Sequence, residues 1–174
     1  MGKKLVKEKW TLIRRISMEF DLLQVQKRTY KKPKEGDIFS LKPKDNLYCF
    51  GKVIKTNVKS SDSFMNGMNL IFVYDFFSKT NMIPDDLEKN EIMFVAVVNH
   101  QPWRRGYAYN ISWSKVTEED INEDYAFWSV GREKYVDLTG NAINRKPRYK
   151  GTFGLGSYGA LGEEIRKELQ KRGL

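Results

Sequence analysis

Between residues 36 and 113 the chain repeats one pattern, in which short runs of β-branched and aromatic residues alternate with polar turn sequences. The run GDIFSLK is followed by PKDN and then by LYCFGKVIK, an order typical of a β-hairpin. NLIFVYDFF, EIMFVAVVN and YAYNISW follow as further strand-like runs. Because strands joined by short connections usually pair with their neighbours, the pattern favours an antiparallel sheet over a parallel one.

Two segments depart from the strand pattern and indicate helices. TEEDINEDYAFW begins with Thr117, a good N-cap residue, and has acidic side chains in its first turn, which favours a short helix. Near the end of the chain, apolar residues recur every four positions at Leu161, Ile165 and Leu169. Glu163 stands four residues before Lys167, a spacing that suits a helical ion pair. These residues predict an amphipathic helix at the C-terminal end.

The fold class that follows is α+β and mainly antiparallel β. We expect a twisted sheet or half-open barrel of about six or seven strands, one or two peripheral helices and a C-terminal helix. A basic extension is predicted over residues 1–32, and a single β-rich domain over residues 33–174. Within the extension, helical spacing of Trp10, Ile13, Phe20 and Leu23 competes with the strand-like alternation of DLLQVQKRTYKK. The sequence does not decide between a helix and a strand for this extension.

The net charge of +9 lies mostly at the N-terminus, where residues 1–34 hold eleven basic and three acidic residues. The rest of the chain is nearly balanced, which argues against a DNA-reading domain because such domains carry their excess charge where they dock. One Cys and one His exclude a disulfide framework and argue against a His/Cys zinc site. The run Ile92–Val98 is too short to cross a bilayer, and MGKKLVKEKW lacks an apolar signal region. We therefore expect a cytoplasmic protein.

Gly154, Gly156 and Gly159 spell G-x-G-x-x-G, a pattern that binds a pyrophosphate in dinucleotide-binding folds. That site needs a following helix, a second parallel strand and an acidic residue about 20 positions later. Only 15 residues remain after Gly159, which leaves no room for the second strand or for the acidic residue. We predict no cofactor, and a structural role in which the glycines lead tightly into the terminal helix with Ser157 or Gly159 as its cap.

No combination of reactive side chains amounts to an active site. Cys49 and His100 could in principle form a thiol–imidazole pair, but Cys49 stands between Tyr48 and Phe50 in a strand, where a thiol usually packs as a small apolar group. Four acidic residues come close together in the chain and could hold Mg²⁺: Asp85, Asp86, Glu88 and Glu91. No E-x-K follows them, so a solvated acidic turn is preferred. We predict no catalytic residues and no metal.

One stretch has the composition of a binding site. QPWRRGYAYNISW brings together residue types that dominate protein interfaces and that also stack on nucleic-acid bases: Trp103, Arg104, Arg105 and Tyr107. We predict that these four residues bind a partner. The alternative is that Trp103 plugs the edge of the sheet while the arginines stay solvated.

The chain carries G-D-x-F at Gly36–Phe39 and a Y-x-F-G-x-V pattern at Tyr48–Val53. These are followed by NLIFVYDFF, by EIMFVAVVNHQPWRRGYAYNI and by YVDLTGNAINRKP. In this order the stretches resemble the bacterial immunity protein 26 family over residues 33–172. Arg105–Tyr107 matches a later family motif, with Ala108 where a Trp is expected. The basic extension is not covered by the resemblance.

The resemblance implies a cytoplasmic protein, encoded beside a polymorphic toxin, that neutralises the toxin by direct binding without catalysis. The positive charge complicates this, since inhibitors of nucleases often mimic the negative charge of the substrate. Either the toxin is not a nuclease or binding avoids its substrate groove. The alternative is a small β-barrel that binds nucleic acid through its basic arm and exposed aromatic residues.

Overall fold

The structure is a computed structural model that describes residues 22–174. The helical spacing predicted from Trp10, Ile13 and Phe20 lies outside the described residues.

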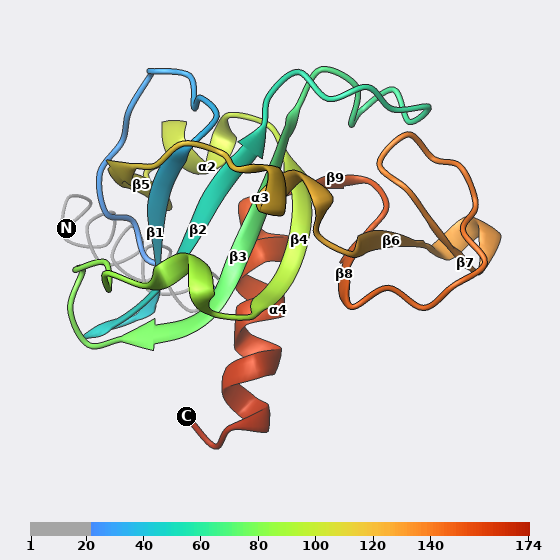
Figure 1. Cartoon of the computed structure of the whole chain (residues 1–174). Coiled ribbons are helices and arrows are strands. Elements are labelled where there is room, and N and C mark those ends of the chain that lie inside the picture. Colours follow the sequence, from blue (N-terminus) through green and yellow to red (C-terminus); the bar gives the residue numbers. More distant parts are fainter. Residues whose placement is uncertain (1–21) are drawn as a thin grey trace, which may run out of the picture.

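Six strands form the larger sheet, sheet A, in the order β5-β1-β2-β3-β4-β9 (Figure 1). Their bounds are β1 (Asp37–Lys44), β2 (Leu47–Lys55), β3 (Asn69–Ser78), β4 (Ile92–Val98), β5 (Ala108–Trp113) and β9 (Leu155–Gly156). Neighbours are antiparallel except β4 and β9, which pair in parallel. The predicted hairpin is present as β1 and β2, whose turn includes Asn46 at a φ of 53°, a conformation that Asn tolerates.

A second, smaller sheet and the helices complete the fold. Sheet B has three strands in the order β7-β6-β8, with β6 and β7 antiparallel and β6 and β8 parallel. The strands are β6 (Tyr125–Ser129), β7 (Lys134–Val136) and β8 (Tyr149–Thr152). The helices are η1 (Leu87–Lys89), α2 (Gln101–Arg104), α3 (Glu118–Asn122), η2 (Val130–Arg132) and α4 (Tyr158–Lys171). The predicted helix after Thr117 is confirmed, but it ends at Asn122, and Tyr125–Ser129 is strand rather than helix.

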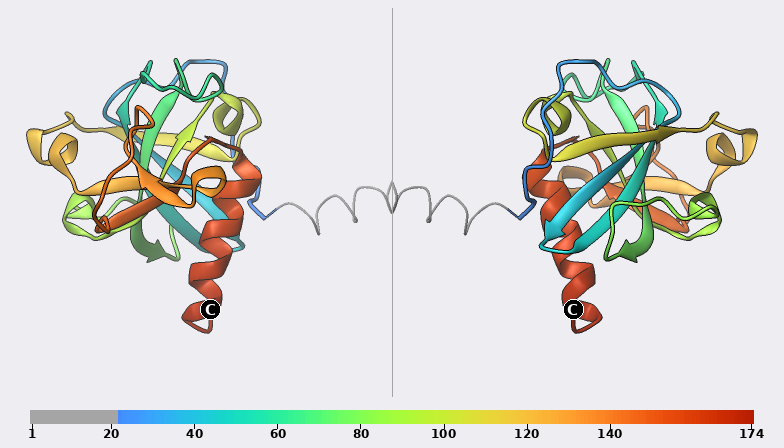
Figure 2. Two further views of the ribbon diagram at one scale, coloured as in Figure 1. Left: turned by 90° about the vertical axis from the view of Figure 1, so that its right-hand side faces the viewer. Right: turned by 90° about the vertical axis from the view of Figure 1, so that its left-hand side faces the viewer.

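Apolar side chains cover both faces of sheet A. On one face, β-strand residues pack with α4, whose Leu161, Ile165 and Leu169 are buried there. On the other face, sheet B supplies Phe127 and Val136. Helix α4 crosses the back of sheet A and extends beyond its edge (Figures 1 and 2). Burial on both faces explains why the β3 and β4 sequences are apolar at consecutive positions rather than alternating.

The predicted fold class is confirmed. The described residues form an α+β structure that is mostly antiparallel, with a C-terminal helix and no closed barrel. The strands number six in sheet A and three in sheet B, more than the six or seven expected. The additional strands are short, and their sequences lack the long apolar runs from which the others were predicted.

The segment 22–32 packs on the body of the protein. Leu23 is only 2% exposed and belongs to the same buried cluster as α4. The backbone N–H groups of Gln24, Gln26 and Thr29 donate hydrogen bonds to the carbonyls of Lys42, Gly106 and Trp103, respectively, over 2.7–3.1 Å. This part of the predicted extension therefore contributes to the core and borders α2.

The glycine-rich approach to α4 has the structural form that the sequence predicts. Ser157 is the N-cap, and its hydroxyl accepts a hydrogen bond from the Ala160 N–H over 3.1 Å. Gly154 has a φ of 145°, which favours glycine. The predicted pairing of Glu163 with Lys167 is not observed, because Glu163 pairs with Arg166 and Lys167 with Glu164, both at i,i+3 spacing.

Replacing Gly156 with alanine is expected to destabilise the protein by about 1 kcal/mol, because a Cβ there would lie 3.3 Å from the Val97 carbonyl oxygen. Gly131→Ala is the matched control, since a Cβ at that position meets nothing within 4 Å. Urea unfolding of both variants measures the difference. Titration with NAD⁺ should give no binding heat for either variant or the parent, and measurable NAD⁺ affinity would contradict the structural role of these glycines.

Candidate partner-binding surface

Trp103 lies in α2, the short helix that follows β4, and it is only 1% exposed. Its ring packs edge-on against Phe39 with centroids 5.3 Å apart. Its indole Nε1 donates to Asn110 Oδ1 over 2.7 Å, and Asn110 Nδ2 in turn donates to Asp37 Oδ2 over 2.8 Å. Trp103 is therefore part of the core, as in the alternative considered from the sequence, and cannot present its face to a partner in this conformation.

Tyr107 follows α2 and is also buried, with 6% of its surface exposed. Its ring stacks on Tyr158, the first residue of α4, with centroids 4.4 Å apart and planes 15° from parallel. Tyr107 thus packs the turn after α2 against Tyr158 at the start of α4.

Arg104 and Arg105 are exposed and rest on aromatic rings. The Arg104 guanidinium lies 5.8 Å from the ring centroid of Tyr30, and the Arg105 guanidinium lies 5.7 Å from that of Tyr158. Across residues 22–174, neither arginine takes part in an ion pair. We call the four residues Arg104, Arg105, Tyr30 and Tyr158 the arginine ledge. Its cations are oriented by the rings and remain available to an anionic partner.

The electrostatic field around the arginine ledge is positive. His100, which immediately precedes α2, has its pKa lowered by partial burial and then by the nearby charges of Lys32 and Arg104. A lowered pKa means that the imidazole loses its proton more readily where cations already crowd the site. The same field favours the approach of an acidic partner.

Two hollows lie next to the arginine ledge. The smaller, of about 170 Å³, includes Arg105 and Tyr158 in its lining. The larger, which we call the apolar pocket, has a volume of about 320 Å³ and lies between α4, β4 and β8. Leu155 and Gly156 line both hollows and form the wall between them.

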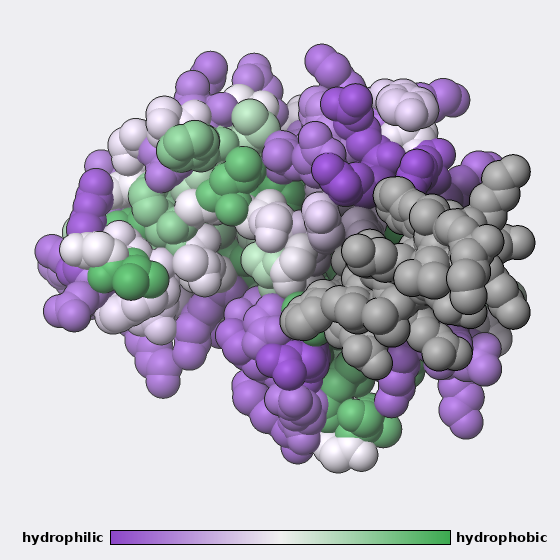
Figure 3. All heavy atoms as spheres, turned by 180° about the vertical axis from the view of Figure 1, so that it is seen from behind, coloured by the Kyte–Doolittle hydropathy of each residue, from purple (hydrophilic) through white to green (hydrophobic). Residues whose placement is uncertain are grey.

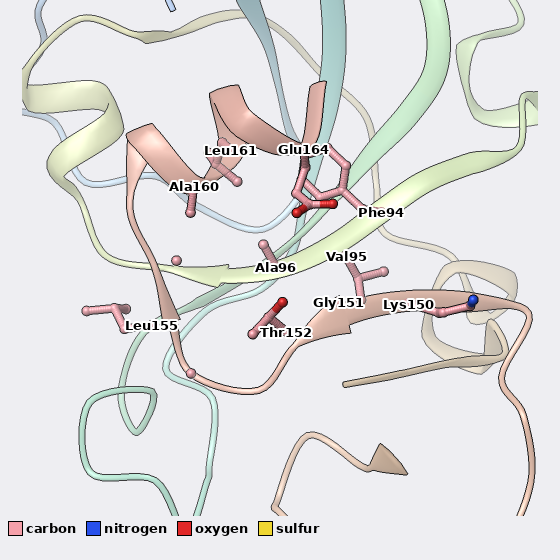
Figure 4. Close-up of a pocket in the computed structure, with 12 residues that line it drawn as sticks. Phe94, Val95, Ala96, Lys150, Gly151, Thr152, Leu155, Ala160, Leu161 and Glu164 are labelled. Carbon is pink, nitrogen blue, oxygen red and sulfur yellow. The ribbon is translucent and has the colours of Figure 1, made fainter. Parts of the chain in front are cut away.

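Views of the molecule place the apolar pocket on its back face. Hydrophobic side chains gather there near β9 and beside the start of α4 (Figure 3). In the close-up, Ala160 and Leu161 of α4 stand on one side and Thr152 of β8 on the other, with Ala96 of β4 between them (Figure 4). The arginine ledge and the apolar pocket therefore form one continuous candidate surface around the first turn of α4.

Two other reactive residues considered from the sequence, Cys49 and Glu91, have the contacts of residues that stabilise the fold. Cys49 is fully buried, and burial raises the pKa of its thiol, which disfavours the nucleophilic thiolate. Glu91 accepts hydrogen bonds from Tyr149 and Arg148. In the part of the chain that is described, no three His, Cys, Asp or Glu side chains lie close enough to hold a metal ion.

A buried ion cluster was missed by the sequence analysis. Lys52, in the middle of β2, is 0% exposed, and its Nζ contacts Glu88 Oε1 of η1 at 2.6 Å and Asp120 Oδ2 of α3 at 2.9 Å. It also donates to the Lys115 carbonyl over 3.1 Å. The only sequence signal is a lysine inside an otherwise apolar strand. The cluster fastens η1 and α3 to sheet A, and it gives Glu88 a structural role.

Of the four residues predicted to bind a partner, the structure brings all of them to one corner but exposes only Arg104 and Arg105. Partner binding by this group stays a prediction. Tyr30, Tyr158 and the lining of the apolar pocket were not predicted, because they come from three separate parts of the chain. None of the helices within residues 22–174 has the length and apolar character needed to span a membrane.

Comparison with known proteins identifies the family of the chain. The family model of immunity protein 26 matches residues 34–134, from the approach to β1 to the start of β7. Neither a search of curated proteins nor a search of solved structures found a match. The match confirms the resemblance seen in the strand motifs, although it ends before β8, β9 and α4. Since it spans more than half of the sequence, the chain belongs to the immunity protein 26 family.

Proposed function

We propose that this protein is a non-enzymatic, cytoplasmic immunity protein that neutralises a cognate bacterial toxin by binding it directly. The observation that carries the proposal is the family match over residues 34–134. The burial of Cys49 supports the absence of catalysis, because its thiol is held protonated and away from solvent.

The arginine ledge is the proposed contact surface. Arginine is favoured at interfaces because its planar guanidinium can form two parallel hydrogen bonds to one carboxylate and can stack on aromatic rings. Arg104 and Arg105 already rest on Tyr30 and Tyr158, so part of the entropy cost of ordering them is met before binding. Trp103 is assigned a supporting role, in which it anchors α2 and so positions Arg104 at the end of the helix and Arg105 directly after it.

The experiment that tests the proposal is co-expression of this protein with the toxin domain that is encoded next to its own gene. The immunity protein should restore growth, and the two purified chains should elute together in size-exclusion chromatography. A toxin that remains active and separate in the presence of the folded immunity protein would contradict the proposal.

Substitution of Arg104 and Arg105 together by alanine should weaken toxin binding at least about tenfold, because arginine is enriched among the hot-spot residues whose truncation costs about 2 kcal/mol or more. The melting temperature should stay close to that of the parent, since both side chains are exposed and form no ion pair within residues 22–174. The matched control is Lys134→Ala/Lys146→Ala, which removes two exposed positive charges near sheet B. Isothermal titration calorimetry measures both pairs, and equal losses would indicate only a general charge effect.

The same arginines could instead contact phosphates, with Tyr30 as a platform for bases. The outcome that would favour this alternative is nucleic-acid binding that weakens steeply with salt and is lost in the Arg104→Ala/Arg105→Ala variant.

A further inference from the structure

We propose that the apolar pocket receives one bulky apolar side chain from an acidic segment of the toxin, whose carboxylates contact Arg105 on one side and Lys150 on the other. The inference rests on the proposed function and adds to it the chemistry of the segment that is bound.

The size and lining of the apolar pocket fit a single side chain. Its volume of about 320 Å³ stands at the lower limit of small-molecule sites. Its floor and walls are apolar and come from Phe94, Ala96, Leu155, Ala160 and Leu161. Its polar side chains are Lys150, Thr152 and Glu164, none of which is buried, so Thr152 supplies the one uncharged polar group among the lining side chains. An aromatic or large aliphatic side chain can bind in such a pocket through burial of its apolar surface.

The charge around the apolar pocket is positive at both ends. Lys150 extends from the end opposite Leu155 (Figure 4) and forms no ion pair with any residue that the structure describes. Arg105 lies in the neighbouring hollow, beyond the wall made by Leu155 and Gly156. The acidic Glu164 is neutralised by Lys167, 2.8 Å away. An apolar side chain flanked by carboxylates therefore matches the surface better than one flanked by basic residues.

The two parts of the surface are close enough for one short segment. Leu155 and Gly156 line both the apolar pocket and the hollow that contains Arg105 and Tyr158, so the two parts of the surface share one wall. Three consecutive residues of an extended chain cover roughly 10 Å, since each residue covers roughly 3.3 Å. A short segment of the partner can therefore cross this wall from the ledge into the pocket.

The identity of the occupant can be read directly by cross-linking. With p-benzoylphenylalanine in place of Lys150, which is exposed at the end of the pocket opposite Leu155, irradiation of a mixture with an excess of the toxin domain should join the two chains. Mass spectrometry should place the bond in a toxin peptide that combines a large apolar residue with acidic neighbours. A bond to a basic or wholly polar peptide, or a bond between two copies of the immunity protein in the absence of toxin, would overturn the inference.

Pocket-filling variants give an independent measurement. Ala160→Trp, which places a large ring in the pocket from an exposed position, should raise the dissociation constant at least about tenfold, and Lys150→Glu several-fold. Gln170→Trp, exposed near the end of the same helix, is the control and should bind as the parent does. If the parent forms no complex, the proposed function fails. If the parent binds and Ala160→Trp binds equally well, the inference alone fails.

Discussion

Replacing Trp103 with alanine is expected to lower the free energy of unfolding by about 3–5 kcal/mol, as is usual for loss of a fully buried aromatic side chain. Trp103 is 1% exposed, packs edge-on against Phe39 and donates a hydrogen bond to Asn110. Removing it opens a cavity at the junction of α2, β1 and β5 and leaves the amide oxygen of Asn110 without its indole partner. Urea unfolding followed by circular dichroism measures the change.

Trp103→Phe is the informative control, because it retains most of the ring volume and loses the indole N–H. It should cost clearly less than Trp103→Ala, with about 1 kcal/mol attributable to the lost hydrogen bond to the half-buried Asn110. A loss below 1 kcal/mol for Trp103→Ala would show that the tryptophan is not a core residue in solution. It would also return Trp103 to the group of candidate contact residues.

Neutralising both carboxylates around Lys52 is expected to cost about 3–5 kcal/mol, the range for a buried charge deprived of its partners. In the variant Glu88→Gln/Asp120→Asn, the shapes and hydrogen-bond acceptors remain, but the Lys52 ammonium loses both counter-charges. The effect should be large because Lys52 is 0% exposed and has no route to water without a shift of η1 or α3. Thermal and urea unfolding both report it.

Adding Lys52→Met to that variant should recover much of the lost stability, because the uncompensated cation is replaced by an apolar side chain of similar length. The matched charge control is Glu118→Gln/Glu119→Gln, on the exposed part of α3, which should cost only about 1 kcal/mol because it removes first-turn charges but no partner of a buried ion. If the triple variant is no more stable than the double variant, the burial of an unpaired cation is not the cause of the loss.

Strands β1 to β5 of sheet A could be predicted from the sequence because their signals are local, whereas the two-residue strand β9 could not. β3 and β4 are long, β-branched and aromatic, and their burial on both faces makes them apolar throughout. The first hairpin has a turn that ends at Asn46, a residue suited to the left-handed conformation found there. Helix α4 has an N-cap at Ser157 and apolar residues on one side.

In sheet B the segment KYVDLTGN predicts β7, but β6 and β8 could not be predicted in the same way, because long-range packing decides them. β8 is only Tyr149–Thr152, and its sequence YKGT has no apolar run. Its position depends on Gly151, which lies so close to β4 that an added Cβ would be 2.1 Å from the Val95 carbonyl oxygen. β6 follows directly after the strong helix signals of α3, which extended the predicted helix too far.

The candidate surface was predicted only in part, since residue type does not reveal exposure. Tryptophan and tyrosine are favoured both in cores and at interfaces, and in QPWRRGY the structure buries Trp103 and Tyr107 and leaves the arginines outside. Lys52 is the opposite case. Lysine is normally exposed, but here it is buried and paired with two acidic residues that are distant in the sequence. The rest of the surface depends on tertiary contacts between α4, β4 and segment 22–32.

The packing of Leu22 and Leu23 against α4 has a consequence for synthesis of the protein. A Cβ at Gly162 would lie 2.5 Å from the Leu22 Cβ, and Leu23 shares a buried cluster with Leu169 of α4. The ribosome makes Leu22 and Leu23 well before it makes α4, so one apolar face of sheet A stays uncovered until α4 has been synthesised. Chains that are still without α4 therefore expose this face, and we expect them to aggregate more readily than the folded protein.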